Sequence, residues 1–183
     1  LGPRDLGRHG PRSPVPDDDE GWEDTVSKTI RIGVIGFGWM GQAHSRGCRR
    51  APSYFLDRDY EPELVVVSDT VEARRIDAVR SFGYQRAVTD WHEVVDAPDV
   101  DVVFITAPNM LHVEMVEAAA AAGKPVFCEK PVGGTPRQTV VAERAARDAG
   151  VITGVGYNYR WAPLVQYAKQ LINNGELGDI TNY

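Results

Sequence analysis

The feature that most constrains the fold is a glycine cluster that directly follows a short apolar stretch, residues 30–35. The cluster has the spacing GxGxxG and comprises Gly36, Phe37, Gly38, Trp39, Met40 and Gly41. Between a strand and a helix, the first glycine allows a tight turn and the second leaves room for a pyrophosphate against the backbone. The third glycine lets the helix pack closely on the strand. The N–H groups and dipole of the helix N-terminus, where Trp39 and Met40 stand, also favour a phosphate. The pattern therefore predicts a dinucleotide site.

Further apolar runs alternate with helical patterns along the chain. The runs are residues 64–67, 102–105, 126–128 and 151–153, and the helical patterns span residues 109–123, 135–150 and 164–172. Short continuous apolar runs suit strands that are buried on both faces of a parallel sheet. The alternation predicts an α/β fold with a doubly wound parallel sheet of the Rossmann type.

Helix start and stop signals support these assignments. Thr135 and Gln138 have the spacing of a capping box, with Pro136 at the first helical position. Gly150 and Gly175 follow helical patterns and suit the left-handed position at a helix end. The stretch between residues 51 and 62 reads as an extended loop.

Composition divides the chain into three parts. Residues 1–29 contain four Pro, four Gly and seven Asp/Glu, so we expect a disordered leader, with an acidic interaction arm as a weaker alternative. Residues 30–156 form the predicted dinucleotide-binding domain. Residues 157–183 are expected to hold a linker helix and, with a β-like stretch at 180–183, the truncated start of an α+β domain with an antiparallel sheet.

Charge and cysteine content exclude several function classes. The net charge of −6 and the pI near 5.2 argue against a nucleic-acid partner, which requires a basic face. No apolar run is long enough to span a membrane, and two cysteines with four scattered histidines predict neither a disulfide framework nor a metal site. A cytoplasmic location fits this composition, and Cys128 is interpreted as a buried strand residue.

Asp69 stands at the end of the second predicted strand. A carboxylate at this position accepts hydrogen bonds from the ribose hydroxyls and repels a 2′-phosphate, which favours NAD. Arg74 and Arg75 could hold a 2′-phosphate, so NADP stays open. The structural alternative, compatible with the first role, is that Asp69 caps a helix beginning at Thr70.

Two later segments resemble one enzyme family. They are residues 105–112, with the sequence ITAPNMLH, and residues 122–131, AGKPVFCEKP. Together with the glycine cluster, and with residues 156–160 and 175–180, they resemble the Gfo/Idh/MocA family of glucose–fructose oxidoreductase and inositol dehydrogenase. The resemblance covers about residues 30–183, and its most specific part is Glu129-Lys130-Pro131 at a strand end.

The resemblance implies a two-domain NAD(P)-dependent oxidoreductase acting on sugars, cyclitols or related polyols. By match to the family, Lys130 is the catalytic lysine and touches both the substrate hydroxyl and the nicotinamide region. Glu129 is expected to hold the lysine or the cofactor in place, and Pro131 is a candidate for a cis peptide bond. The plain alternative for Lys130 is a surface lysine, but ligands bind at the carboxyl ends of parallel strands.

The resemblance also implies roles for the loops that follow other strands. The expected cofactor contacts after the strand at 102–105 are Thr106, Pro108, Asn109 and His112, and the expected substrate-side residues are Tyr157, Asn158 and Arg160. Asn109 is equally well explained as a helix N-cap, and His112 as a residue that stabilises its loop. His44, in the helix after the glycine cluster, is interpreted as structural.

Two hypotheses of different class follow. The first is part of a polyol dehydrogenase whose further catalytic Asp and His, in the family, lie on the second domain and so beyond Tyr183. Such an enzyme is expected to form a homo-oligomer. The second hypothesis is a non-catalytic dinucleotide sensor. Lys130 favours the first, because a sensor has no need of a Glu-Lys-Pro segment at the cleft.

Overall fold

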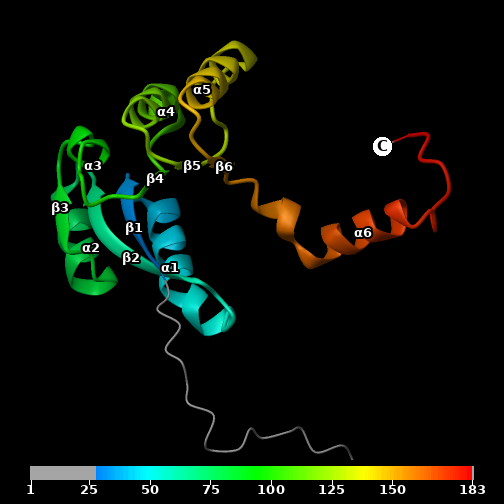
Figure 1. The fold of residues 1–183 in the computed structure, drawn as a ribbon, viewed down its shortest axis with the longest axis horizontal. Coiled ribbons are helices and arrows are strands. Elements are labelled where there is room, and N and C mark those ends of the chain that lie inside the picture. Colours follow the sequence, from blue (N-terminus) through cyan, green and yellow to red (C-terminus); the bar gives the residue numbers. More distant parts are fainter. Residues whose placement is uncertain (1–27, 183) are drawn as a thin grey trace, which may run out of the picture.

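The computed structural model describes residues 28–182, in which six strands form one parallel sheet with helices on both faces (Figure 1). The strands are β1 (Lys28–Ile35), β2 (Tyr60–Ser68), β3 (Arg86–Val88), β4 (Val102–Ile105), β5 (Val126–Cys128) and β6 (Thr153–Val155). The α-helices are α1 (Trp39–Tyr54), α2 (Glu72–Phe82), α3 (His92–Val95), α4 (His112–Ala121), α5 (Pro136–Asp148) and α6 (Pro163–Asn173). Two 3-10 helices are η1 (Asn109–Leu111) and η2 (Asn158–Trp161).

The strand order is β3-β2-β1-β4-β5-β6, and every neighbouring pair is parallel. The order reverses at β1, because β2 and β3 extend the sheet on one side and β4, β5 and β6 on the other. This is the doubly wound, Rossmann-type order that the sequence predicts. All the carboxyl ends of the strands therefore lie along one edge of the sheet.

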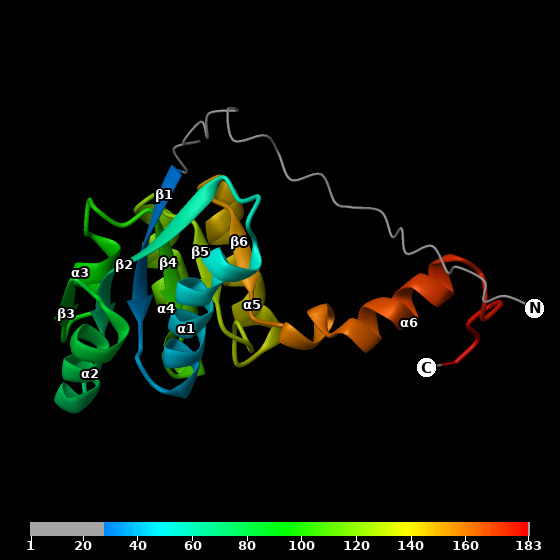
Figure 2. The same cartoon turned by 90° about the horizontal axis from the view of Figure 1, so that it is seen from below.

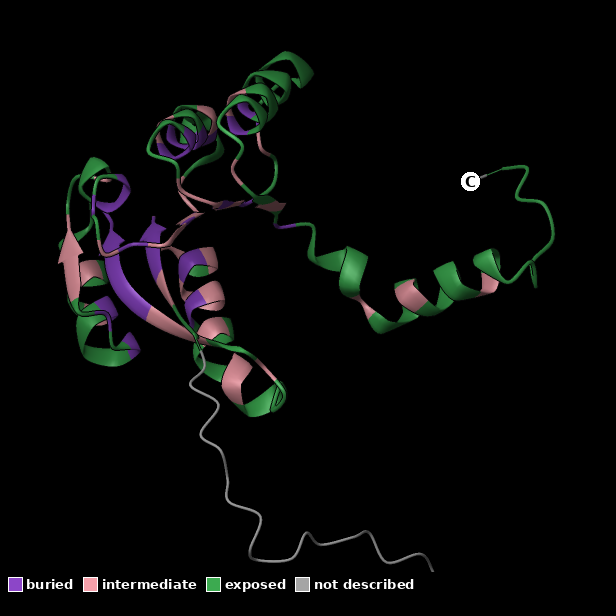
Figure 3. Ribbon diagram, in the orientation of Figure 1, coloured by how far each residue is buried: buried purple, intermediate pink, exposed green. Residues whose placement is uncertain are grey.

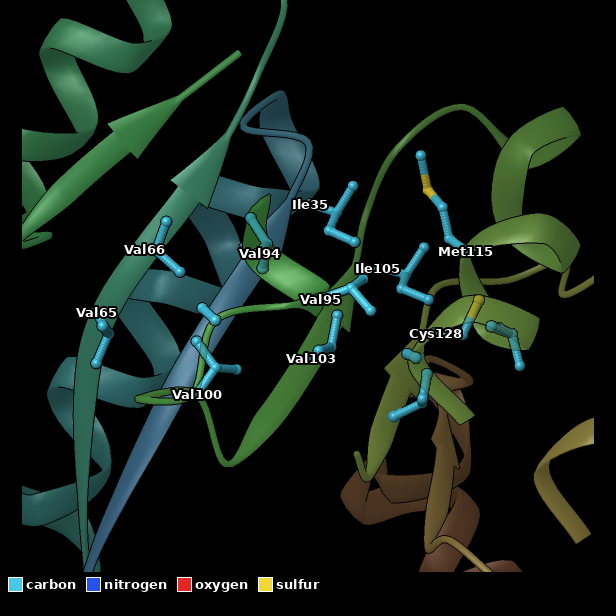
Figure 4. Packing of buried hydrophobic residues seen from close by; sticks show 14 of the residues in the cluster. Ile35, Val65, Val66, Val94, Val95, Val100, Val103, Ile105, Met115 and Cys128 are labelled. Carbon is cyan, nitrogen blue, oxygen red and sulfur yellow. The ribbon is translucent and has the colours of Figure 1, made fainter. Parts of the chain in front are cut away.

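Two buried apolar clusters fill the two faces of this sheet. One includes Val94 of α3, Val103 of β4 and Met115 of α4 (Figure 4). The other packs against α1 and α2 and includes Phe37 and Phe82, whose ring centroids lie 4.9 Å apart in an edge-to-face contact. Burial of each such side chain stabilises the fold by about 1.5–3 kcal/mol. The sheet is thereby fixed between its helices.

The boundaries near the N-terminus differ from the predictions. The predicted leader at 1–29 lies outside the described residues up to residue 27, and its last two residues, Lys28 and Thr29, begin β1. The predicted loop at 51–62 is shorter, because α1 continues through Pro52 to Tyr54 and β2 begins at Tyr60. Arg58 explains the longer helix, since its Nη1 donates to the backbone oxygens of Pro52 (2.9 Å) and Phe55 (3.2 Å) near the helix end.

The predicted strand at 151–153 is shifted by two residues in the structure. Gly150 has a φ of 68°, as predicted for a helix end, and the Val151 N–H still donates to Ala146 O of α5 at 3.1 Å. The chain is therefore still part of the helix cap at Val151, and β6 begins only at Thr153. At the other end of α5 the N-cap half of the predicted capping box is confirmed, because the Thr135 side chain accepts from the Gln138 N–H. The Gln138 side chain contacts the Thr135 hydroxyl, with Oε1 3.4 Å from Oγ1, instead of the backbone N–H that a capping box uses.

Two further predictions are wrong, one for the start of a helix and one for a strand near the C-terminus. Residues 109–111 form η1 rather than the first turn of α4, and the N-cap residues of η1 and α4 are Pro108 and Leu111 rather than Asn109. The predicted β-like stretch at 180–182 is not a strand in the structure, and Tyr183 lies outside the described residues. A strand requires a partner, and none is next to this stretch in the described chain.

Helix α6 extends away from the sheet, as Figures 1 and 2 show. Its predicted apolar stripe includes Leu164 and Tyr167, which are 80% and 57% exposed, so most of the helix is coloured as exposed in Figure 3. Across residues 28–182, no helix combines the length and apolar character needed to cross a lipid bilayer.

Candidate functional site

The predicted site residues follow five of the six strands at the carboxyl edge of the sheet. The glycine cluster follows β1, Asp69 follows β2, Thr106 follows β4, Glu129 follows β5, and Tyr157 comes two residues after the end of β6. Because all these strands are parallel, segments that are far apart in the sequence end side by side.

The three glycines of the cluster have the geometry that the sequence predicts. Gly36 has a φ of 89°, and a Cβ on it would lie 2.8 Å from the Ala107 nitrogen. A Cβ on Gly41 would lie 2.2 Å from Gly36 O, so only glycine permits this approach of helix and turn. A Cβ on Gly38 would have no neighbour within 4 Å and would project into open space. These positions fit a dinucleotide pyrophosphate, because the space beside Gly38 lies at the N-terminus of α1.

Asp69 connects the glycine cluster to α2. Its Oδ2 accepts from the Phe37 N–H at 2.7 Å, and its Oδ1 accepts from the Val71 N–H at 2.8 Å. Val71 is the N-cap residue of α2, so the predicted cap role is wrong in detail: the carboxylate supports the turn before the helix instead. Arg74 Nη1 lies 3.4 Å from Oδ2, and Arg75 donates to the Asp69 backbone oxygen at 2.7 Å.

The loop after β4 is tied to the glycine cluster by Thr106. The Thr106 hydroxyl lies 2.5 Å from Gly36 O and 3.2 Å from Ile35 O. Pro108 and Asn109 follow on the exposed side of this loop. Thr106 therefore fixes the backbone, while contact of these three residues with a cofactor stays a prediction.

His112 is buried between two loops of the site. It is 1% exposed, and its Nδ1 lies 2.9 Å from Pro131 O while its Nε2 lies 2.8 Å from Ala107 O. Two roles are predicted for His112, contact with the cofactor and stabilisation of its loop. These hydrogen-bonding distances correspond to the second role. They join the loop after β4 to the loop after β5.

In the loop after β5, the buried carboxylate of Glu129 is followed by the exposed residue Lys130. Glu129 is 5% exposed, and its Oε2 accepts from the Lys130 N–H at 3.1 Å, whereas the Lys130 residue is exposed. The Lys130–Pro131 peptide bond is cis, as predicted. Cys128 is buried as predicted, and burial together with the nearby Glu129 carboxylate raises the pKa of its thiol to about 12.

Sequence reasoning missed one member of this group, His44. Its Nε2–H donates to Glu129 Oε1 at 2.7 Å across 85 positions of the chain. Its ring packs edge-on against Phe127, with centroids 4.9 Å apart. The sequence offers one signal, a histidine one turn after Gly41 in the helix that carries the glycine cluster.

The predicted substrate-side residues Tyr157, Asn158 and Arg160 lie on or next to η2 and are all exposed. They follow β6 and Gly156, which packs against Glu129. Within residues 28–182, no group of three or more His, Cys, Asp or Glu side chains is arranged to hold a metal ion.

A hollow of about 710 Å³ lies elsewhere in the molecule. Its lining includes Lys28, Tyr60 and Pro125, at or just before the first residues of their strands. It is therefore at the edge of the sheet opposite to the glycine cluster and Lys130, and it takes no part in the candidate site.

Known proteins resemble this chain in both sequence and structure. Levoglucosan dehydrogenase of Pseudarthrobacter phenanthrenivorans is 35% identical over 156 residues, which are 85% of this chain and 40% of that protein. The scyllo-inositol 2-dehydrogenase (NAD(+)) of Bacillus subtilis is 31% identical over 149 residues, covering 81% of this chain and 42% of that protein. A solved levoglucosan dehydrogenase in complex with NADH and levoglucosan superposes with a TM-score of 0.80 at 36% identity, over 84% of this chain and 41% of that one.

The chain thus spans about 40% of the length of these relatives. A family model described as an oxidoreductase family with an NAD-binding Rossmann fold matches residues 30–157, which is more than half of the chain. The glycine cluster, Asp69, and the Glu129-Lys130-Pro131 segment all lie within this match. The chain therefore belongs to the Gfo/Idh/MocA oxidoreductase family.

Proposed function

We propose that this chain forms the cofactor-binding part of an NAD-dependent dehydrogenase that transfers hydride between the nicotinamide and a sugar, cyclitol or related polyol. The observation that carries the proposal is the contrast among the three glycines. A Cβ on Gly36 or Gly41 would collide with backbone, whereas a Cβ on Gly38 would enter open space at the start of α1. A pyrophosphate fits such a space, because the backbone N–H groups at the start of a helix can bind it without any side chain.

In this proposal Gly36, Gly38, Gly41 and the backbone of Trp39 and Met40 hold the pyrophosphate. Asp69 accepts hydrogen bonds from the ribose hydroxyls, since two backbone N–H groups leave part of its acceptor capacity free. The loop residues Thr106, Pro108, Asn109 and His112, and the Glu129 carboxylate, border the rest of the cofactor. NAD, when bound, supplies the hydride acceptor.

Lys130 is the proposed catalytic residue. As a neutral amine it would accept the hydroxyl proton while the carbon loses hydride to the nicotinamide, or as an ammonium group it would polarise the substrate hydroxyl, while Tyr157, Asn158 and Arg160 line the substrate side. Support comes from the position of Lys130, exposed at the end of β5 beside a fixed carboxylate. The first substrates to test are levoglucosan and scyllo-inositol, the compounds that appear in the names of the two relatives.

NAD is the proposed cofactor in preference to NADP, because the Asp69 carboxylate repels a 2′-phosphate. Arg74 and Arg75, which contact Asp69, would lessen this preference by attracting the same phosphate.

The proposal also concerns the parts of the chain around the sheet. The leader would end at residue 27, because Lys28 and Thr29 belong to β1. Residues 28–156 would be the cofactor domain, and residues 157–183 a linker helix leading into an antiparallel substrate and oligomerisation domain. The exposed apolar stripe of α6 supports a covering partner at this end. We further propose a cytoplasmic homo-oligomer without a nucleic-acid partner, in accord with the net charge of −6.

Calorimetric titration with NADH tests the proposal, with Gly38→Val as the diagnostic variant. The wild-type chain should bind NADH, and the variant should fold normally yet lose binding, because its side chain occupies the pyrophosphate space. Equal binding by the two proteins would refute the assignment of the site. Absorbance at 340 nm, measured on the protein as the cell makes it with NAD and a panel of polyols, then separates the enzyme from a sensor. A sensor would bind NADH and reduce no NAD.

A further inference from the structure

Three segments of the chain converge on the Glu129 carboxylate. Its Oε1 accepts from His44 of α1 at 2.7 Å, and its Oε2 accepts from the Lys130 N–H at 3.1 Å. The third segment is the end of β6, where a Cβ on Gly156 would lie 2.6 Å from Oε1 and 2.8 Å from the carboxyl carbon. The carboxylate is thus held at both oxygens and enclosed by backbone.

The donor from α1 is itself held in one orientation. The His44 side chain is 23% exposed, and its ring meets Phe127 and Phe104 edge-on at centroid distances of 4.9 and 6.2 Å. Its neighbours along α1 include Gly41, whose close packing on the β1 turn fixes the helix. The position of the His44 ring nitrogen therefore depends on the helix that starts at the glycine cluster.

We propose that His44 is a positioning residue for hydride transfer: it orients Glu129, which in turn fixes the backbone from which Lys130 projects. This inference rests on the proposed function. It adds a chain of contacts that connects α1, the helix after the glycine cluster, to the loop after β5 that carries Lys130. His44 itself touches neither cofactor nor substrate in this proposal, and its effect passes through the Glu129 carboxylate.

The geometry provides two independent ways to break the link. His44→Leu removes the donor to Oε1 at similar side-chain volume, whereas His44→Gln retains an N–H donor at nearly the same reach. Gly156→Ala leaves His44 intact and pushes the carboxylate aside, since its Cβ would overlap both Oε1 and the carboxyl carbon. Gly47→Ala is the matched control, because a Cβ there meets nothing within 4 Å on the same helix as His44.

The first measurement is amide hydrogen exchange at Lys130 in the 183-residue chain without cofactor. Exchange should be about 10-fold faster or more in His44→Leu and Gly156→Ala, because the carboxylate acceptor is displaced. It should stay near wild type in His44→Gln and Gly47→Ala. Unchanged exchange at Lys130 in both disruptive variants would overturn the inference, whether or not the protein binds NADH.

The second measurement uses the protein as the cell makes it, with the polyol that the wild type oxidises fastest. Both disruptive variants should lower kcat about 10–100-fold, as expected for a misplaced catalytic group, while the Kd for NADH rises by a clearly smaller factor, because Glu129 is only one of the groups that border the cofactor. His44→Gln should recover most of kcat. If His44→Leu loses NADH affinity in proportion to kcat while Gly156→Ala does not, then His44 acts on the glycine cluster and the inference is wrong. If the wild type binds no NADH, the proposed function fails instead.

Discussion

Two glycines of helix α1 should respond in opposite directions to the same substitution. A Cβ on Gly41 would lie 2.2 Å from Gly36 O and 3.0 Å from the Thr106 hydroxyl, whereas a Cβ on Gly47 would meet nothing within 4 Å. Carbon and oxygen atoms in contact normally lie more than about 3 Å apart, so Gly41→Ala forces the helix and the turn apart by roughly 1 Å.

The magnitudes follow from these distances. Overpacking of this kind costs about 1–3 kcal/mol, of which the better helix propensity of alanine returns up to about 1 kcal/mol. Gly47→Ala keeps the propensity gain without the collision, so it should stabilise the chain by about 0.5–1 kcal/mol. The propensity gain is common to both variants, so they should differ by the overpacking cost of about 1–3 kcal/mol, which corresponds to a difference in Tm of roughly 2–12 °C for a domain of this size.

Thermal and urea unfolding, followed by circular dichroism, measure this difference directly. Gly41→Ala should unfold at a lower temperature and lower urea concentration than wild type, and Gly47→Ala at higher values of both. If Gly41→Ala matches the wild type, the helix does not approach the β1 turn as closely as the structure has it. If Gly47→Ala is destabilised, the open space assigned beside that position is wrong.

Four further outcomes are expected. Lys130→Ala should lower kcat roughly 10²–10⁴-fold with little change in the Kd for NADH, and a silent substitution would remove Lys130 from the mechanism. Asp69→Ala should weaken the preference for NAD over NADP, measured as the ratio of the two Kd values. It should also destabilise the chain by about 1–3 kcal/mol, because the buried Phe37 N–H loses its acceptor. A hydrogen bond from Arg31 lowers the pKa of Asp101 from 3.8 to about 2, so its stabilising effect is full above about pH 4 and is lost as the pH falls through 2. Because the Asp101 side chain is 38% exposed, Asp101→Asn should reduce that acid sensitivity by no more than about 1 kcal/mol in urea titrations. Cys128, with its pKa raised to about 12 by burial, should resist iodoacetamide at pH 8 until urea unfolds the chain, as followed by mass spectrometry.

The sheet could be predicted from the sequence because its signals are local. Short apolar runs such as 64–67 and 102–105 lie within strands, and the glycine spacing at Gly36, Gly38 and Gly41 specifies a turn whose geometry depends on adjacent residues. At the end of α1, where the prediction of a long loop failed, a side chain outside the helix decided the outcome. Arg58 supports an end of α1 that Pro52 alone would not predict.

For the site, the sequence predicted where the loops lie but not the contacts between them. Each loop could be assigned to the carboxyl edge, because parallel strands bring their ends together whatever the distance in sequence. The contacts between loops could not be assigned in the same way. The pair of His44 and Glu129 spans 85 positions, and nothing in either local sequence specifies the other partner. Such a pairing depends on where α1 comes to lie on the sheet.

These contacts between loops hold the site together through bonds within the chain itself. Thr106 ties the loop after β4 to Gly36, the His112 ring nitrogens lie within hydrogen-bonding distance of backbone oxygens in the loops after β4 and β5, and His44 reaches Glu129. Each hydrogen bond contributes only about 0.5–1.5 kcal/mol to stability, so together they are a minor part of what holds the fold. Their main effect is to fix where the loops lie relative to one another. Every loop of the proposed site except the Asp69 turn is bonded to a neighbouring strand or loop on the β4 or β5 side. The Asp69 turn is joined to the glycine cluster, because its carboxylate accepts from the Phe37 N–H. A cofactor that binds such a site would have little loop entropy to overcome, and in the proposed arrangement the same contacts hold the backbone at Lys130 through its N–H bond to Glu129.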